Sequence, residues 1–200
     1  MKVTSISIFR HNGAGTDPTC LGAVSDLQNF GFFQRPAVRE MLTFVSRTIV
    51  TRTEPGQRQS VEHEEFVGHV CCNRESLAAI VFVDKEYPAR SAFCVVNKVL
   101  DDFVEKHGAS WKTITADCEM GNELLEPALV KYQDPAQADK LAKIQKELDE
   151  TKVILHKTID SVLERGEKLD SLVDKSSDLS LASQMFYKQA KKQNQCCKMM

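Results

Sequence analysis

The stretch from residue 136 to residue 194 contains no proline, and it constrains the fold more than any other feature. Stepping through it by three and four residues alternately gives a mostly apolar seam flanked by charged and amide side chains, the pattern of a coiled coil. A helix of about 55 residues would be roughly 80 Å long, too long for a domain of this size to cover. We therefore predict one extended helix over residues 139–195, with its apolar stripe buried by other chains.

The start of this helix has its own signal. Asp134 can cap the helix, Pro135 suits its first position, and Gln137 completes a capping-box-like pattern. We place a first domain at 1–132 and a linker at 133–138, ahead of the heptad segment at 139–195 and a tail at 196–200. The seam positions assigned to core layers are Leu141, Ile144, Leu148, Leu155, Val162, Leu169, Leu172, Leu179 and Phe186.

One charged residue, Arg165, interrupts the seam between Val162 and Leu169. Burying a guanidinium is costly unless partner side chains supply acceptors for its donors. A buried polar residue also fixes the register of a bundle, because every slipped alignment would place it against an apolar layer. We interpret Arg165 as a polar layer of the seam. The alternative is that the seam drifts and Arg165 is a solvated surface residue.

Residues 1–132 mix strand-like and helix-like patterns. Alternation from Val3 to Ile8 and a short apolar run at 20–24, separated by the loop HNGAGTDP, predict a hairpin. Further strands are predicted at 59–64, 66–72 and 77–83, and helices are predicted to begin at Pro36 and after Tyr87-Pro88. The run LAAIVFV is apolar throughout, which favours a central strand. The order ββαβββα predicts an α+β domain, with an antiparallel five-stranded sheet flanked by helices.

Two parts of the sequence resemble a known family. The seam from 141 to 193, with Arg165 in the string VLERGEKLDSLV, is similar to the SNARE motif of R-SNAREs. The N-terminal order of elements, with FFQR before the first helix and YPARSAF opening the second, resembles the profilin-like longin domain. The resemblance implies vesicle docking and membrane fusion, in which Arg165 pairs with three glutamines from Q-SNARE helices in a bundle of one R helix and three Q helices.

The last residues predict a lipid anchor. Cys197 to Met200 matches a C-a-a-X box whose final Met favours a farnesyl group on Cys197, although Lys198 departs from the aliphatic preference. One isoprenoid gives only reversible attachment, so Cys196 is the expected second site, for a palmitoyl or a second prenyl group. No run of residues is apolar enough to span a bilayer. This combination resembles the YKT-type, lipid-anchored branch of the family; the alternative is a frayed tail with two idle thiols.

Phe44 lies on the predicted first helix, roughly 120° away from its main apolar face. With Ala37, Met41 and Thr48 it forms a second, smaller apolar strip that the sheet does not cover. A chain with a lipid and an unpaired heptad stripe has further apolar surface to hide. We expect the SNARE segment to fold back over this strip in a closed form, as the family resemblance also implies. The alternative is an isolated exposed aromatic residue.

Composition and motifs argue against other functions. A net charge of −2 disfavours nucleic acid as a partner. The sequence lacks phosphate-loop, dinucleotide-turn and nucleophile-elbow motifs, and its five histidines lack the spacing of metal ligands. We therefore predict no catalytic residue, no metal, and no cofactor apart from covalent isoprenoid and acyl groups.

The cysteines and the N-terminus predict the compartment. Seven cysteines without a secretory signal suggest free thiols in the reducing cytosol. The family resemblance adds a lipid-anchored pool on the cytosolic face of Golgi, ER-Golgi, endosomal or vacuolar membranes. Two other readings remain open: a lipidated trafficking adaptor whose coiled coil binds a non-SNARE partner, and an acyl carrier that uses Cys71, Cys72 or the tail cysteines.

Overall fold

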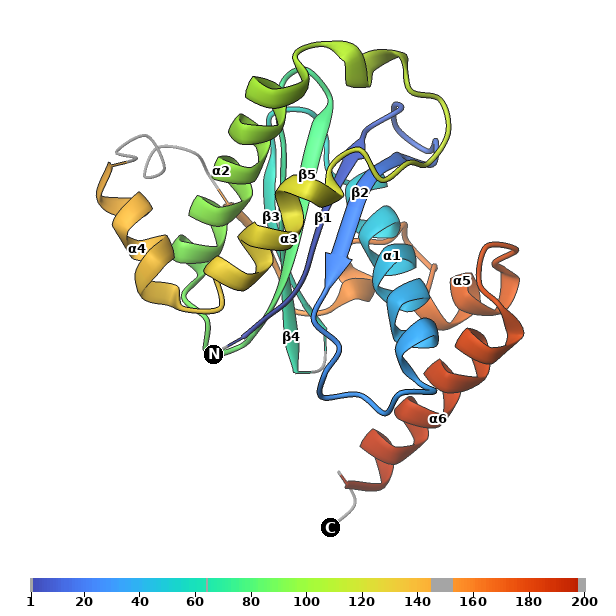
Figure 1. Ribbon diagram of the computed structural model, residues 1–200. Helices are drawn as coiled ribbons and strands as arrows, with labels where there is room; N and C mark the ends of the chain where they lie inside the picture. Colours follow the sequence, from blue (N-terminus) through green and yellow to red (C-terminus); the bar gives the residue numbers. More distant parts are fainter. Residues whose placement is uncertain (1, 64, 145–152, 198–200) are drawn as a thin grey trace.

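The computed structural model describes residues 2–63, 65–144 and 153–197, with the backbone alone for 141–144 and 193–197. Figure 1 shows a central sheet with helices on both of its faces. The strands of the first domain are β1 (Val3–Arg10), β2 (Thr19–Ser25), β3 (Arg58–His63), β4 (Phe66–Cys72) and β5 (Leu77–Asp84). Neighbouring strands among these five are antiparallel, so the predicted antiparallel sheet is confirmed.

β5 is central, as its sequence predicts. It pairs with β1 on one side and β4 on the other, and Leu77 to Val83 are all buried. Because side chains alternate along a strand, β5 contributes to two cores. Ala79, Val81 and Val83 face the core on one side of the sheet, whereas Ala78, Ile80 and Phe82 face the core on the other side.

Different helices cover the two faces of the sheet. α2 (Ala89–His107) and α3 (Asn122–Lys131) cover one face, with the short 3-10 helix η1 (Ser110–Thr113) between them and α4 (Pro135–Ile144) against α2. The opposite face carries α1 (Arg35–Thr51), which buries Val38, Met41, Val45 and Ile49. The predicted α+β class and both long helices are therefore confirmed. α1 alone leaves part of its face of the sheet to be covered by another segment.

The prediction of one extended helix over 139–195 is wrong for this conformation. The segment instead forms the end of α4, then β6 (Val153–His156), the 3-10 helix η3 (Ile159–Ser161), α5 (Leu169–Lys175) and α6 (Leu181–Cys197). β6 pairs in parallel with β3, which makes a mixed, six-stranded sheet in the order β2-β1-β5-β4-β3-β6. α4 begins at Pro135, as the capping signal predicts, with the Ala136 N–H donating to Asp134 Oδ1 at 3.0 Å, so this helix includes residues that the domain division assigns to the linker.

The physical reason for this difference is that one straight helix would leave its apolar stripe exposed to water. A heptad stripe without a partner must bury its apolar side chains against its own domain, and a straight helix could touch that domain only along a short length. Gly166, at φ +94°, turns the chain between η3 and α5 in a conformation that side-chain-bearing residues rarely adopt. Within the described residues, no helix has the combined length and apolarity needed to cross a membrane.

Candidate functional site

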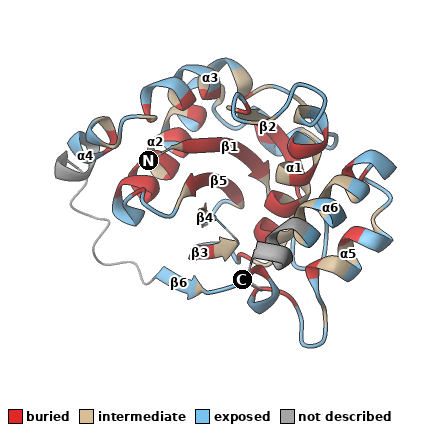
Figure 2. Cartoon of the chain, turned by 90° about the horizontal axis from the view of Figure 1, so that it is seen from below, coloured by how far each residue is buried: buried red, intermediate tan, exposed pale blue. Residues whose placement is uncertain are grey.

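The candidate site is the contact between the first domain and residues 153–192, which we call the closing segment. This segment follows the α1 side of the sheet, and Figure 2 shows its strand β6 exposed at the sheet edge beyond β3. Its buried apolar residues join the core formed by α1, β4 and β5. These buried residues are Ile159, Val162, Leu163, Leu169, Val173 and Leu179. The closing segment thus completes a core that the first domain leaves open.

The predicted core-layer residues have different environments. Val162, Leu169 and Leu179 are buried, and Leu172 packs partly buried against the same core. Phe186 is half-buried, and Leu155 on β6 is 62% exposed. The side chains of Leu141 and Ile144 and the whole of Leu148 lie outside the described residues. The side chains of Ile159, Leu163 and Val173, which the heptad assignment leaves out, are buried as well. Ile159 lies on η3 and Val173 on α5.

A polar clasp formed by Glu40, Ser180 and Ser183 fixes α6 against α1. Glu40 Oε2 accepts hydrogen bonds from Ser180 N–H at 3.1 Å, Ser180 Oγ at 2.8 Å and Ser183 Oγ at 2.6 Å. Ser183 is fully buried, so its hydroxyl needs this partner. Hydrogen bonds from the two serines, chiefly that from Ser183, lower the pKa of Glu40, since they favour the charged carboxylate. The clasp sets where along α1 the closing segment lies.

Two further polar contacts hold the closing segment. Arg52, at the end of α1, pairs with Glu167 at 2.8 Å, and this pairing lowers the pKa of the Glu167 carboxyl. Tyr187 of α6 donates to Asp170 Oδ1 of α5 at 2.8 Å, and Lys191 pairs with the same carboxylate. The first contact joins the Gly166 turn to the domain, and the second joins α5 to α6. Exposed ion pairs contribute little stability, so these contacts mainly select one geometry.

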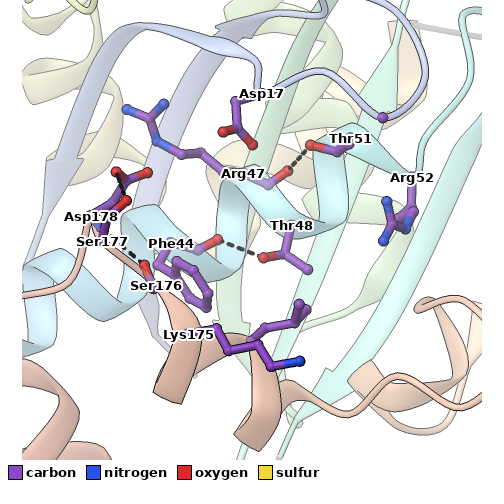
Figure 3. A pocket seen from close by; sticks show the side chains of 12 residues that line it. Asp17, Phe44, Arg47, Thr48, Thr51, Arg52, Lys175, Ser176, Ser177 and Asp178 are labelled. Atoms are coloured by element: carbon purple, nitrogen blue, oxygen red, sulfur yellow. Dashed lines mark hydrogen bonds between the residues drawn. The ribbon is translucent and has the colours of Figure 1, made fainter.

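Phe44 lies at this contact. Its ring packs partly buried against the shared core, together with Leu172 and Tyr187. It also lines a shallow pocket between α1 and the segment around Lys175, and Figure 3 shows the ring projecting from α1 toward that segment. The closing segment therefore covers Phe44 in part in this conformation.

Arg165 is exposed on a turn in which the Glu167 N–H donates to Glu164 O at 2.9 Å. Its guanidinium is accessible to solvent there, so the closed arrangement avoids burying a charge. Cys196 and Cys197 end α6, and their side chains lie outside the described residues.

The arrangement mainly covers apolar surface, and the described cysteines nearest to it are buried. Cys71 and Cys72 are buried, and burial raises the pKa of both thiols, that of Cys72 to about 12. Such thiols stay protonated near neutral pH and are poor nucleophiles, which argues against an acyl carrier at these positions. Among the described residues, no group of three or more His, Cys, Asp or Glu side chains could hold a metal ion.

Comparison with known proteins bears on both halves of the chain. A family model for Longin, a regulated-SNARE-like domain, matches residues 27–126, and one for Synaptobrevin matches residues 140–200. VAMP-like protein YKT61 of Arabidopsis thaliana is 56% identical, covering 98% of both chains. Synaptobrevin homolog YKT6 of Eremothecium gossypii is 51% identical over 100% of both chains, and its namesake from Saccharomyces cerevisiae is 46% identical over 98% of both.

Replacing Gly166 with Ala should shift the chain away from the closed arrangement. A Cβ at Gly166 meets nothing within 4 Å, so only the backbone conformation is affected. Positive φ disfavours Ala by about 1–2 kcal/mol, and Ala favours an uninterrupted helix over Gly by about 1 kcal/mol. We expect protease cleavage within 153–192 to become at least about tenfold faster. Gly108→Ala, at φ +56° with equally open surroundings, is the control and should leave that cleavage unchanged. Equal cleavage of the Gly166 variant and the wild type would contradict the strained turn.

Phe44→Glu should open the same contact from the side of the domain. It removes a partly buried ring and places a carboxylate against Leu172, at a cost of about 2 kcal/mol or more. Limited proteolysis of the chain in solution should show faster cleavage within 153–192. Phe33→Glu introduces the same charge at a ring that is 93% exposed, so it should not change cleavage. If both variants were as resistant as the wild type, Phe44 would not hold the segment.

Proposed function

This chain belongs to the longin-containing R-SNAREs of the synaptobrevin family and acts in vesicle trafficking with SNARE partners. We propose that it drives membrane fusion by folding its heptad segment into a four-helix bundle with three Q-SNARE helices. The family is one of trafficking proteins and is not known for catalysis. In the proposed mechanism no covalent bond changes. Burial of the heptad stripe between helices from opposing membranes releases the free energy that brings the bilayers together.

The observation that carries this proposal is the double use of the heptad residues. Val162, Leu169 and Leu179 are buried against the first domain here, and the same side chains are core layers of the proposed bundle. A side chain cannot be buried in both places, so closure and assembly compete. A partner that binds only the open form shifts the equilibrium by its difference in affinity for the two forms. The first domain would therefore act as a reversible inhibitor of assembly.

Arg165 is the proposed polar layer of the bundle. The closed chain keeps it in water, and the bundle would bury it among glutamine side chains that accept from its guanidinium. A match at this layer alone would align the four helices, since any shift would leave the guanidinium without acceptors. The register of the assembled helices would thus depend on a residue that contributes nothing to the closed form.

Membrane attachment is proposed through Cys197 and Cys196. The C-a-a-X motif Cys197–Met200 would take a farnesyl group on Cys197, and a palmitoyl or second prenyl group on Cys196 would convert a transient attachment into a stable one. We place the chain in two pools, one in the cytosol and one on the cytosolic face of Golgi, ER-Golgi, endosomal or vacuolar membranes. The cytosolic pool would be closed, because the closed form hides the stripe from water.

Arg165→Ala should weaken the assembled bundle without affecting the closed free chain. Because Arg165 is exposed in the closed form, this change should leave the unfolding midpoint of the free chain unchanged. Mixed with three Q-SNARE segments, the variant should give a complex that dissociates at lower temperature, by about 2–4 kcal/mol of lost stability. Lys168→Ala removes a neighbouring exposed charge and serves as the control. If the variant complex were as heat-resistant as the wild-type complex, Arg165 would not be a core layer of the bundle. If the wild-type chain formed no four-chain complex at all, that result would favour the adaptor function.

Cys197→Ser should abolish the anchor. Intact mass measured on protein from its own cells should show an isoprenoid on the wild type and none on the variant, and the variant should leave the membrane fraction. Cys196→Ser should keep the isoprenoid and lower membrane residence by about tenfold or more, since one chain alone binds marginally. Bare terminal thiols on wild-type protein in every fraction would refute lipid anchoring.

A further inference from the structure

Two aromatic residues in the loop between β2 and α1 are exposed to solvent. Phe32 is 74% exposed and Phe33 is 93% exposed, and no element among the described residues covers them. Isolated exposed apolar residues are ordinary, but two adjacent phenylalanines on a loop tip are costly in water and indicate an interaction surface. The described contacts of the closing segment do not use these two rings: they lie along α1 around Phe44 and Glu40, whereas Phe32 and Phe33 precede the first turn of α1.

The loop presents these rings in a defined geometry. The Phe30 N–H donates to Leu27 O at 3.0 Å, and the Gln34 N–H donates to Gly31 O at 2.8 Å, which closes two successive turns. The Phe32 and Phe33 rings pack edge to face, with centroids 5.6 Å apart. An arrangement held by backbone hydrogen bonds loses little conformational entropy when the rings bind something.

Basic side chains adjoin the rings. Arg35 donates from Nε to Phe30 O at 3.2 Å, and its guanidinium lies 6.0 Å from the centroid of the Phe32 ring. One turn further along α1, Arg39 lines a shallow pocket together with Arg35 and Val130, which is 75% exposed. Asp26, the carboxylate at this pocket, is paired with Lys2 at 3.1 Å. The surface therefore combines exposed apolar side chains with guanidiniums. This combination is complementary to a lipid-water interface with negatively charged headgroups.

The position of the loop agrees with this chemistry. In Figure 1 the β2–α1 loop and the C-terminal end of α6 both lie toward the lower end of the molecule. A bilayer at that end would meet the aromatic pair on the same side as the proposed lipid-bearing cysteines. The inference rests on the proposed function in this one respect, that the chain works at a membrane.

We propose that Phe32 and Phe33 insert into the interface of a bilayer containing anionic lipid, with Arg35 and Arg39 against its headgroups. Because the closed contact leaves the loop free, the chain can dwell on a membrane while its heptad residues are still buried. The loop would thus add a weak, salt-sensitive attachment that does not require the SNARE partners. Attachment of this kind would bring a closed chain to its target surface before it opens.

The test uses the full chain without its lipid groups and two kinds of vesicle, phosphatidylcholine alone and phosphatidylcholine with phosphatidylserine. A Phe33→Trp variant reports insertion, because Trp111, the chain's one natural tryptophan, is 2% exposed and gives a constant background. We expect a blue shift and quenching by brominated acyl chains with the phosphatidylserine vesicles, both weakened by salt. Phe32→Ser with Phe33→Ser should lower vesicle binding by about tenfold or more. Arg39→Glu should lower it only where phosphatidylserine is present.

The matched control is Leu181→Ser with Met185→Ser, which also removes two exposed apolar side chains, 78% and 63% exposed on α6. It should bind vesicles as the wild type does. The proposal would be overturned if the emission of the Phe33→Trp variant did not shift, or if the variant with both phenylalanines replaced bound vesicles as well as the wild type. It would also be overturned if the control lost as much binding as that variant. So would competition by a soluble isoprenoid analogue, which would assign the surface to the chain's own lipid. Assembly with Q-SNARE segments, measured in parallel, should not change in the Phe32→Ser, Phe33→Ser variant, so failure here is distinguishable from failure of the proposed function.

Discussion

Burial of one set of apolar side chains against the α1 side of the sheet governs the whole structure. The first domain covers one face of its sheet with α2 and α3, whereas the other face has only α1 until Val162, Leu169, Val173 and Leu179 complete its core. These side chains come from a sequence whose heptad spacing suits a helical bundle. Each buried aliphatic side chain contributes about 1.5–3 kcal/mol, so the domain is a substantial competitor for the segment.

Polar contacts decide how the segment lies. The serine hydroxyls at Glu40 and the pairing of Arg52 with Glu167 add little net free energy at a surface, but misplacing the fully buried Ser183 would leave its hydroxyl without a partner. The parallel addition of β6 to β3 gives the otherwise open edge of the sheet a hydrogen-bonded neighbour. Apolar burial alone would allow the closing segment several positions, and these directional contacts select one of them. All of them break together if the segment becomes a continuous helix.

Much of the first domain could be predicted from the sequence, because its signals are local. The apolar run at β5, the stripe on α1 and the cap at Asp134 each lie within one element and agree with the structure. The closing segment could not be predicted in the same way. The heptad periodicity of this segment suits the proposed bundle with Q-SNARE helices. Its folded shape here depends instead on contacts such as that of Glu40 with Ser183, which are 143 residues apart. The glycine of this stretch, Gly166, stands where the structure breaks the helix, and β6 forms only because β3 offers it an edge.

The central claim is that closure and bundle assembly use the same residues and exclude one another. Amide hydrogen exchange of β3 tests it most directly, because β3 lies between β4 and β6 and its outer hydrogen bonds exist only while β6 is paired. The free full-length chain should protect the β3 amides that face β6, and a chain assembled with three Q-SNARE segments should lose that protection while β5 keeps its own. Equal protection of β3 in the free and assembled chains would contradict the account.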